Sequence, residues 1–205
     1  MTSTIQSLIE ARISANSFDP AREVTDAQIT ELVRLATRAP SAFNYQNWRF
    51  IAVKSAEAKA RLKAAAYNQP KVGDASVTFI VCGTLNAHLG LAAALKPSVD
   101  AGIVPQAMAD GWVGMAASGY GVNPAAQRDE AIRSASLASM TLMLAAEGMG
   151  LVTGPMIGFD PAAVAREFGL GADDIPAMLI TVGYAAAGNW PQKPRRAVAD
   201  VLRIV

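Results

Sequence analysis

Cysteine, histidine and charged residues are scarce in this chain of 205 residues, and these shortages exclude several classes of protein. The single cysteine, Cys82, rules out a disulfide framework within the chain and any metal site built on several thiolates. His88 is the only histidine. Charged residues make up 17% of the sequence, against a usual share of about 25%. This shortfall is a hint of surface covered by a partner, although an alanine-rich composition explains it equally well.

The sequence also lacks segments that bind membranes or nucleic acids. The formal net charge is +1, and the one basic cluster, residues 193–196, is too short for a polymer but suits a single phosphate. No stretch of about 18 uncharged apolar residues is present to cross a membrane. The N-terminus has no basic region followed by an apolar one. We therefore expect a cytoplasmic protein with neither a membrane nor a nucleic-acid partner.

Helix signals recur along the chain. Residues 5–12 carry apolar side chains at helical spacing. Thr25 and Gln28 form a capping box for a helix that Pro40 is expected to end. A long helix is predicted over about residues 125–147. Other helix boundaries are marked by capping residues and glycines at Ser55, Gly148, Gly150 and Asp160.

Short apolar runs predict buried strands at residues 48–53, 77–82 and 177–182, the second of which contains Cys82 as a buried cysteine rather than a catalytic thiol. Residues 86–123, rich in glycine and alanine, have no clear assignment. Helices and strands do not follow strict βαβ alternation, which argues for an α+β fold over a doubly wound one. The chain ends on apolar residues, so its tail is expected to dock on something.

Residues 148–154 nearly match the glycine fingerprint of dinucleotide-binding proteins. The spacing has one residue too many, and the segment follows a helix, whereas the fingerprint must follow a strand and open a helix. We therefore interpret it as a helix C-cap and a turn.

Polar groups suited to a planar, phosphorylated ligand occur in several short segments. Arg12 and Ser14 can both reach one phosphate if the chain turns there. Residues 39–48, dense in small polar groups and anchored by Trp48, can hydrogen-bond the edge of a heterocycle. Residues 68–71 and 193–195 add further amides and cations. Alone, the signal from Arg12 and Ser14 is very weak, and residues 39–48 also fit an ordinary capped turn.

In this order the motifs resemble those of the FMN-dependent nitroreductase family. Arg-x-Ser-x-x-x-Phe at residues 12–18 precedes Ala-Pro-Ser-x-x-Asn-x-Gln-x-Trp at 39–48, Asn-x-x-Lys at 68–71, a loop at 154–159 and Lys-x-Arg at 193–195. The resemblance spans about residues 5–200. It implies one nitroreductase-like domain over residues 1–205, with a central, mostly antiparallel sheet flanked by helices and a C-terminal tail exchanged in a homodimer.

The resemblance also implies an FMN site shared between two subunits. Arg12, Ser14, Lys193 and Arg195 would hold the phosphate. Asn68 and Lys71 would approach the pyrimidine edge, where a cation favours flavin reduction. Residues 155–158 would line the other face and offer a backbone N–H, and residues 40–44 would come from the second subunit. The expected cofactor-binding set is Arg12, Ile13, Ser14, Asn16, Pro40, Ser41, Ala42, Asn44, Asn68, Lys71, Pro155, Met156, Ile157, Gly158, Lys193 and Arg195.

Some positions depart from the family pattern. Asn16 stands where many members have lysine or arginine, Ile157 replaces an acidic residue of some members, and Asn47 replaces a common proline. The segment holding Met108, Trp112, Met115 and Tyr120 falls where the family covers the substrate side of the flavin. We interpret these side chains mainly as packing residues.

The implied activity is that of an NAD(P)H-dependent FMN oxidoreductase. NADH or NADPH would reduce FMN and leave, and a small acceptor such as a nitroaromatic or a quinone would then take the electrons in a ping-pong mechanism. Neither a catalytic side chain nor a metal is expected, since hydride transfer to flavin needs no protein base. The alternatives are an enone reductase, a reductive dehalogenase or a flavin-cleaving enzyme on the same scaffold, and a non-enzymatic flavin-binding redox sensor or FMN store.

Overall fold

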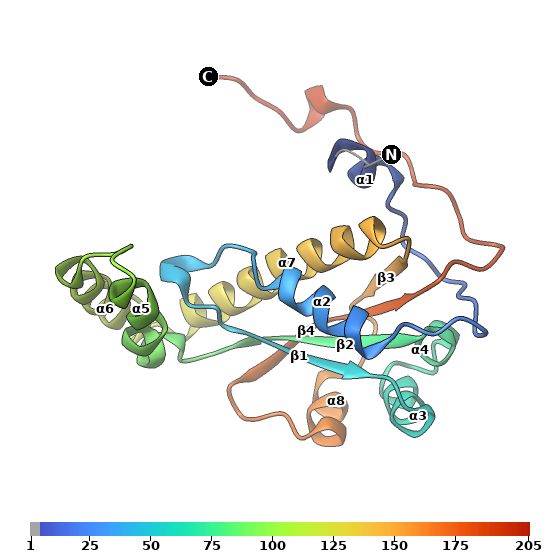
Figure 1. The fold of residues 1–205 in the computed structure, drawn as a ribbon, viewed down its shortest axis with the longest axis horizontal. Helices are drawn as coiled ribbons and strands as arrows, with labels where there is room; N and C mark the ends of the chain where they lie inside the picture. The colour runs from blue at the N-terminus through green and yellow to red at the C-terminus, as the bar shows by residue number, and fades with distance from the viewer. Residues whose placement is uncertain (1–4) are drawn as a thin grey trace.

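A computed structural model describes residues 5–205 of the chain (Figure 1). Within those residues, helices surround a single four-stranded sheet in the order β1-β2-β4-β3, with every neighbouring pair antiparallel. This arrangement confirms the predicted α+β class. The strands are β1 Trp48–Val53, β2 Val77–Thr84, β3 Val152–Met156 and β4 Asp174–Gly183. The helices are α1 Ile5–Ala11, α2 Asp26–Ala36, α3 Ala56–Ala65, α4 Pro70–Asp74, α5 Leu91–Asp100, α6 Gln106–Tyr120, α7 Pro124–Gly148 and α8 Pro161–Phe168.

The sheet lies between two layers of helices. α2 and α7 cover one face, and α3, α4 and α8 cover the other (Figure 1). Alternate side chains of β2 serve the two cores: Phe79 and Val81 pack toward α2 and α7, while Ile80 and Cys82 pack toward the opposite layer. Because both faces are covered, every residue of β2 from Val77 to Gly83 is buried, instead of every second one. Each such buried side chain contributes about 1.5–3 kcal/mol of hydrophobic stabilisation.

Helix α2 begins as predicted but ends earlier. The Thr25 hydroxyl accepts the Gln28 N–H at 3.2 Å, and the Gln28 side chain accepts the Thr25 N–H at 2.9 Å, so the capping box is confirmed. The prediction that Pro40 ends the helix was wrong, because α2 stops at Ala36. The next residues form a tighter turn, in which the Ala39 N–H donates to the Ala36 carbonyl, three residues earlier instead of four. A residue before proline is driven out of the helical region, so the last turn unwinds ahead of Pro40.

β3 is a strand in a segment predicted as a turn and loop. Gly150, with a φ of 72°, ends the turn after α7 as expected, but the chain then pairs with β4. Pro155 is tolerated because β3 lies at the edge of the sheet, where one side needs no hydrogen-bond donor. Glycine and proline lower strand propensity, which hid this strand in the sequence.

Residues 86–123, unassigned from the sequence, form the helical hairpin of α5 and α6. The hairpin projects to one side of the sheet (Figure 1). Its core is small and packs Leu91, Leu95 and Ala109 against Tyr45 from the segment before β1. Frequent alanine and glycine gave these helices too weak an apolar periodicity to recognise.

After β4 the chain leaves the body of the molecule. Residues 189–205, here called the C-terminal arm, run past α1 and extend outward (Figure 1). The apolar side chains of Val198, Leu202 and Ile204 are 68%, 56% and 87% exposed, so most of their surface is open in the single chain described here. Among residues 5–205, no helix is long and apolar enough to cross a membrane.

Candidate cofactor site

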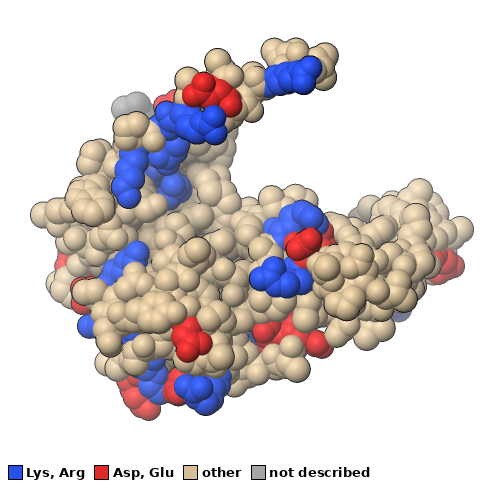
Figure 2. Space-filling view, turned by 180° about the vertical axis from the view of Figure 1, so that it is seen from behind, with Lys and Arg blue, Asp and Glu red and all other residues tan. Residues whose placement is uncertain are grey.

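The two ends of the chain meet around one small basic cavity. Arg12 and Ser14 lie on one side of it and Lys193 and Arg195 on the other, and the cavity measures about 50 Å³. After the role that the family resemblance implies for them, we call these four residues the phosphate cluster. Figure 2 shows Lys and Arg side chains gathered where the C-terminal arm leaves the body, beside a hollow under the arm. Residues from opposite ends of the sequence thus line the same cavity.

Strand β3 fixes the position of the N-terminal half of this cluster. Ser14 forms a parallel bridge with Thr153, and the Ala15 N–H donates to the Thr153 carbonyl at 2.8 Å. The approach is close enough to require a glycine next to it. A Cβ atom on Gly154 would lie 2.5 Å from the Ala15 carbonyl oxygen. Arg12 and Ser14 are therefore held by the edge of the sheet.

Two side-chain amides hold the C-terminal arm against this segment. The Asn189 side-chain oxygen accepts the N–H groups of Asn16 and Ser17 at 2.8 and 3.0 Å. Its amide nitrogen donates to the Ser17 carbonyl at 2.8 Å. The Gln192 amide donates to the Arg12 carbonyl at 3.1 Å. The sequence interpretation missed Asn189 and Gln192, because isolated amides carry no recognisable motif. Asn16, predicted as a ligand, uses its backbone for this clamp.

The cations of the site repel one another and are not paired with carboxylates in the described part of the chain. Burial, and then the nearby Lys193 charge, lower the pKa of Lys71. The guanidinium groups of Arg12 and Arg195 donate to the neighbouring Ile13 and Lys193 carbonyls rather than to carboxylates. No salt bridge joins these four cations to an acid among the described residues. A region where cations raise each other's energy fits a multiply charged anion such as a phosphate monoester.

The carboxyl group of Glu147 interacts electrostatically with Arg12. Burial raises the pKa of its carboxyl, while Arg12 acts in the opposite direction.

The predicted pyrimidine-edge and flavin-face segments are joined directly. The Gln69 amide donates to the Gly158 carbonyl at 2.7 Å, linking residues 68–71 to residues 155–158. Asn68 has a φ of 57°, a left-handed conformation that asparagine adopts more readily than most residues. Met156 is only 8% exposed and packs in the core, whereas Ile157 is 80% exposed. Of these two, Met156 could offer a ligand only its backbone.

The 40–44 loop lies away from all of these segments. It follows α2 and abuts the α5–α6 hairpin and the start of α7, at the opposite end of the sheet from the point where the C-terminal arm begins (Figure 1). Pro40 and Asn44 are exposed, while Ser41 and Ala42 are half-buried. One chain therefore brings together every predicted segment of the site except this loop.

Several other residues considered from the sequence lie outside the site. Cys82 is buried in β2 as predicted, and burial raises the pKa of its thiol to about 12, so it is not a nucleophile. Trp112 and Tyr120 pack around Phe43, which confirms a packing role for those two. Met108 and Met115 are 49% and 54% exposed on α6.

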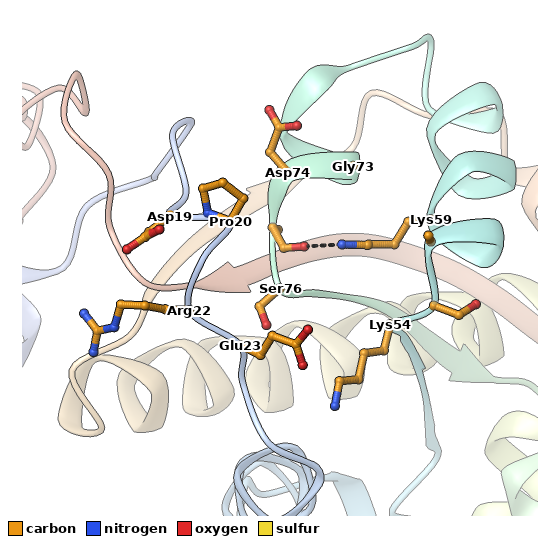
Figure 3. A pocket seen from close by; sticks show the side chains of 12 residues that line it. Asp19, Pro20, Arg22, Glu23, Lys54, Lys59, Gly73, Asp74 and Ser76 are labelled. Atoms are coloured by element: carbon orange, nitrogen blue, oxygen red, sulfur yellow. Dashed lines mark hydrogen bonds between the residues drawn. The ribbon is translucent and has the colours of Figure 1, made fainter.

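A separate cavity of about 620 Å³ opens between the segment before α2, the start of α3 and the end of α4 (Figure 3). It shares no lining residue with the phosphate cluster. Charges of both signs line it, including Glu23, Lys54 and Asp74. Lys59 spans one side and donates to the Ala75 carbonyl at 2.9 Å. This mixed lining does not favour an anion as the phosphate cluster does.

Comparisons with known proteins identify similar sequences and folds. A model of the Nitroreductase family matches residues 9–184. YodC of Bacillus subtilis, provisionally named an NAD(P)H nitroreductase, is 33% identical over 90% of this chain and 91% of its own. A provisionally named nitroreductase from Exiguobacterium sibiricum, solved in complex with FMN, is 30% identical, with a TM-score of 0.91 over 100% of this chain and 99% of that one. The enone reductase CLA-ER, from gut-bacterial fatty acid metabolism, is 26% identical, with a TM-score of 0.84 over 98% and 97% of the two chains.

Proposed function

The chain belongs to the nitroreductase family, and from that premise we propose that it is an FMN-dependent oxidoreductase that uses NADH or NADPH to reduce small acceptors such as nitroaromatics or quinones. The observation that carries the proposal is the meeting of Arg12, Ser14, Lys193 and Arg195 around one cavity. The E. sibiricum relative in complex with FMN supports the choice of cofactor.

The chemistry of the site residues suits FMN, and each segment of the site would contact a different part of the cofactor. The phosphate cluster would hold the monophosphate with three cations and a hydroxyl, the charge-assisted contacts that bind phosphates most strongly. Lys71 would bring positive charge to the pyrimidine edge of the ring, and the backbone of residues 155–158 would border one face. When bound, FMN supplies the hydride chemistry, accepting from the nicotinamide and giving to the acceptor. The residues of the chain would bind and orient FMN and set the charge around it.

We propose that donor and acceptor occupy the same flavin face in turn, which is a ping-pong mechanism. Residues 148–154, the one stretch resembling a dinucleotide fingerprint, form the end of α7, a turn and the start of β3. A second, dedicated nicotinamide site therefore has no support in this segment.

We also propose that the working unit is a homodimer in which each 40–44 loop completes the partner subunit's site. This arrangement explains why the loop lies far from the phosphate cluster of its own chain. It also gives the exposed apolar residues of the C-terminal arm a surface to cover. A twofold contact is self-complementary, so both sites would form together.

An enone reductase on the same scaffold is the second candidate, and the similarity to CLA-ER over nearly the whole chain favours keeping it. Both candidates bind FMN and accept electrons from a nicotinamide, so they differ only in the acceptor. Turnover of an α,β-unsaturated ketone, compared with that of a nitroaromatic and a quinone, separates them.

The first test is an absorbance spectrum of the purified protein followed by anaerobic titration with each nicotinamide. We expect a yellow protein with about one FMN per chain, bleached rapidly by NADH or NADPH. FAD, or no flavin after reconstitution, would contradict the proposal. Bleaching by dithionite but by neither nicotinamide would instead favour a flavin-binding sensor.

A further inference from the structure

The side chain of Glu130, near the start of α7, is a buried carboxylate that reaches the 40–44 loop. It is 3% exposed. One carboxylate oxygen accepts the Ala42 N–H at 3.2 Å and the Ser134 hydroxyl at 3.0 Å, and the other pairs with the Arg133 guanidinium. A charge this deeply buried is costly unless its hydrogen bonds are satisfied. The donors from Arg133 and Ser134 come from its own helix, and the third is the loop backbone.

The loop that Glu130 contacts has an unusual backbone. Phe43, Asn44 and Gln46 have φ values of 50°, 59° and 51°, in the left-handed backbone region that residues other than glycine rarely adopt. Such conformations persist only where surrounding contacts enforce them. The Gln46 N–H donates to the Ser41 hydroxyl at 2.9 Å, but this bond lies within the same segment.

Contacts from outside the loop come from two sides. The Phe43 ring packs edge-on against Trp112 of α6, with ring centroids 6.4 Å apart. This apolar contact fixes no hydrogen-bond direction. Glu130 supplies a directional, charged contact, and it acts at Ala42, in the middle of the residues predicted to reach the flavin.

We propose that Glu130 is a positioning residue that holds the 40–44 loop in the shape needed to complete the FMN site of the partner subunit. This inference rests on the proposed function, which supplies both the cofactor and the dimer. Glu130 itself touches no cofactor atom in this scheme. Its effect on affinity arises because apparent binding scales with the fraction of molecules whose loop is in the competent conformation.

Two substitutions separate the reach of the Glu130 side chain from its charge. Glu130→Asp keeps the charge beside Arg133 but withdraws the carboxylate from Ala42. Glu130→Gln loses the charge but keeps an oxygen within reach of the Ala42 N–H. We expect Glu130→Asp to raise the Kd of FMN about tenfold or more and Glu130→Gln to raise it less than about threefold. An electrostatic role for Glu130 within α7 predicts the reverse order.

Ser139→Ala is the matched control on the same helix. Ser139 is buried, and its hydroxyl has no hydrogen-bond partner among the described residues. This variant removes a buried polar group from α7 without touching the loop, so its Kd for FMN should equal that of the wild type. Circular dichroism and thermal unfolding of all the variants check that each one folds.

A mixed dimer shows in which subunit Glu130 acts. One chain carries Glu130→Asp and the other Arg195→Ala, with different affinity tags so that the mixed species can be purified. One site then combines an intact phosphate cluster with an intact loop, and the other combines both defects. We expect one FMN per dimer to bind with wild-type Kd, whereas neither parent homodimer has such a site.

The outcomes are distinct. A wild-type Kd for Glu130→Asp, or the absence of a wild-type site in the mixed dimer, would overturn the role of Glu130 while leaving FMN binding intact. Failure of the wild-type protein to bind FMN would overturn the proposed function, and the inference with it. A wild-type site in the mixed dimer, together with a larger rise in Kd for Glu130→Asp than for Glu130→Gln, supports the role of Glu130 and the proposed function.

Discussion

At the scale of single residues, the phosphate cluster combines the Ser14 hydroxyl with three cations, none of which forms a salt bridge among the described residues. The Arg195 guanidinium donates to the Lys193 carbonyl, while its neighbour Arg196 donates to the Asp200 carbonyl at 3.2 Å. Only Arg195 of these two lines the basic cavity. The pair therefore offers a comparison between adjacent arginines of which only one lines the cavity.

Arg195→Ala should weaken FMN binding by about 1.5–3 kcal/mol, the range for a hydrogen bond to a charged group. This corresponds to a rise in Kd of about ten- to a hundredfold. The fold should persist, because Arg195 is exposed on the arm. Quenching of FMN fluorescence measures the Kd, and Arg196→Ala is the control with an expected wild-type value. An unchanged Kd in Arg195→Ala would remove this residue from the phosphate site.

Lys71 links the charge of the site to the stability of the protein. Burial and the Lys193 charge lower its pKa in the folded protein below the unfolded value of about 10.4. The folded state then binds fewer protons than the unfolded state between those two pKa values. The free energy of unfolding of the FMN-free protein should therefore rise with pH in that window.

Lys71→Met should remove this pH-dependent rise and stabilise the FMN-free protein at neutral pH while weakening FMN binding. Lys71 is half-buried, so after solvent screening the gain should stay below about 1 kcal/mol. This corresponds to a rise in Tm of up to about 4 °C. Thermal unfolding at a series of pH values, with and without FMN, tests both effects. A lower Tm in the FMN-free variant would show that Lys71 stabilises the fold.

At the scale of elements, β3 connects the sheet to the N-terminal half of the site. Gly154 is the point of closest approach, where an added Cβ would lie 2.5 Å from both the Ala15 carbonyl oxygen and the Thr181 hydroxyl. Neither neighbour is the free end of a flexible side chain. The segment that carries Arg12 and Ser14 must therefore move if this glycine is replaced.

Gly154→Ala should lower the free energy of unfolding by about 1–3 kcal/mol, as overpacking of a filled site does. It should also raise the Kd of FMN, because Arg12 and Ser14 shift together. Gly114→Ala in α6 is the matched control, since an added Cβ there meets nothing within 4 Å. That variant should gain about 0.5–1 kcal/mol from helix propensity. Urea unfolding of the two variants, if it gave equal changes, would refute the close-approach argument.

Elements with local boundary signals could be predicted from the sequence. Thr25 caps α2, Asp160 accepts the Ala162 and Ala163 N–H groups at the start of α8, and Gly150 closes the turn after α7. β3 and the α5–α6 hairpin could not be predicted. β3 depends on its position at the sheet edge, and the α5–α6 hairpin depends on a small core shared with Tyr45. Neither condition can be recognised from the residues of the element itself.

The same distinction applies to the candidate site. The order of the motifs predicted the phosphate cluster and residues 68–71 as site residues, because each motif is short and has a fixed spacing. Asn189 and Glu130 were missed, because their roles depend on which distant segments meet. Asn189 and its partner Asn16 are separated by 173 positions, and Ala42 and Glu130 by 88.

At the scale of the whole molecule, two features of the single chain are left unexplained by its own packing. The C-terminal arm exposes apolar side chains, of which Val201 is 66% exposed and Val205 fully exposed. The 40–44 loop carries predicted flavin contacts but lies at the far end of the sheet from the phosphate cluster (Figure 1). A monomer whose tail packs on its own sheet accounts for neither feature, whereas a twofold dimer accounts for both.

Deletion of residues 197–205 should therefore abolish the dimer and FMN binding together, even though Arg195 and the rest of the phosphate cluster remain. The physical reason is that the arm would bury its apolar side chains on the partner, and without that contact neither loop reaches the other subunit's site. Sedimentation velocity with detection at both the protein absorbance and the flavin absorbance measures the two properties in one experiment. The full-length protein should sediment as a flavin-loaded dimer, and the truncated one as a colourless monomer of slightly less than 21.4 kDa. A monomer that still holds FMN at micromolar concentration, full-length or truncated, would show that one chain forms the site alone.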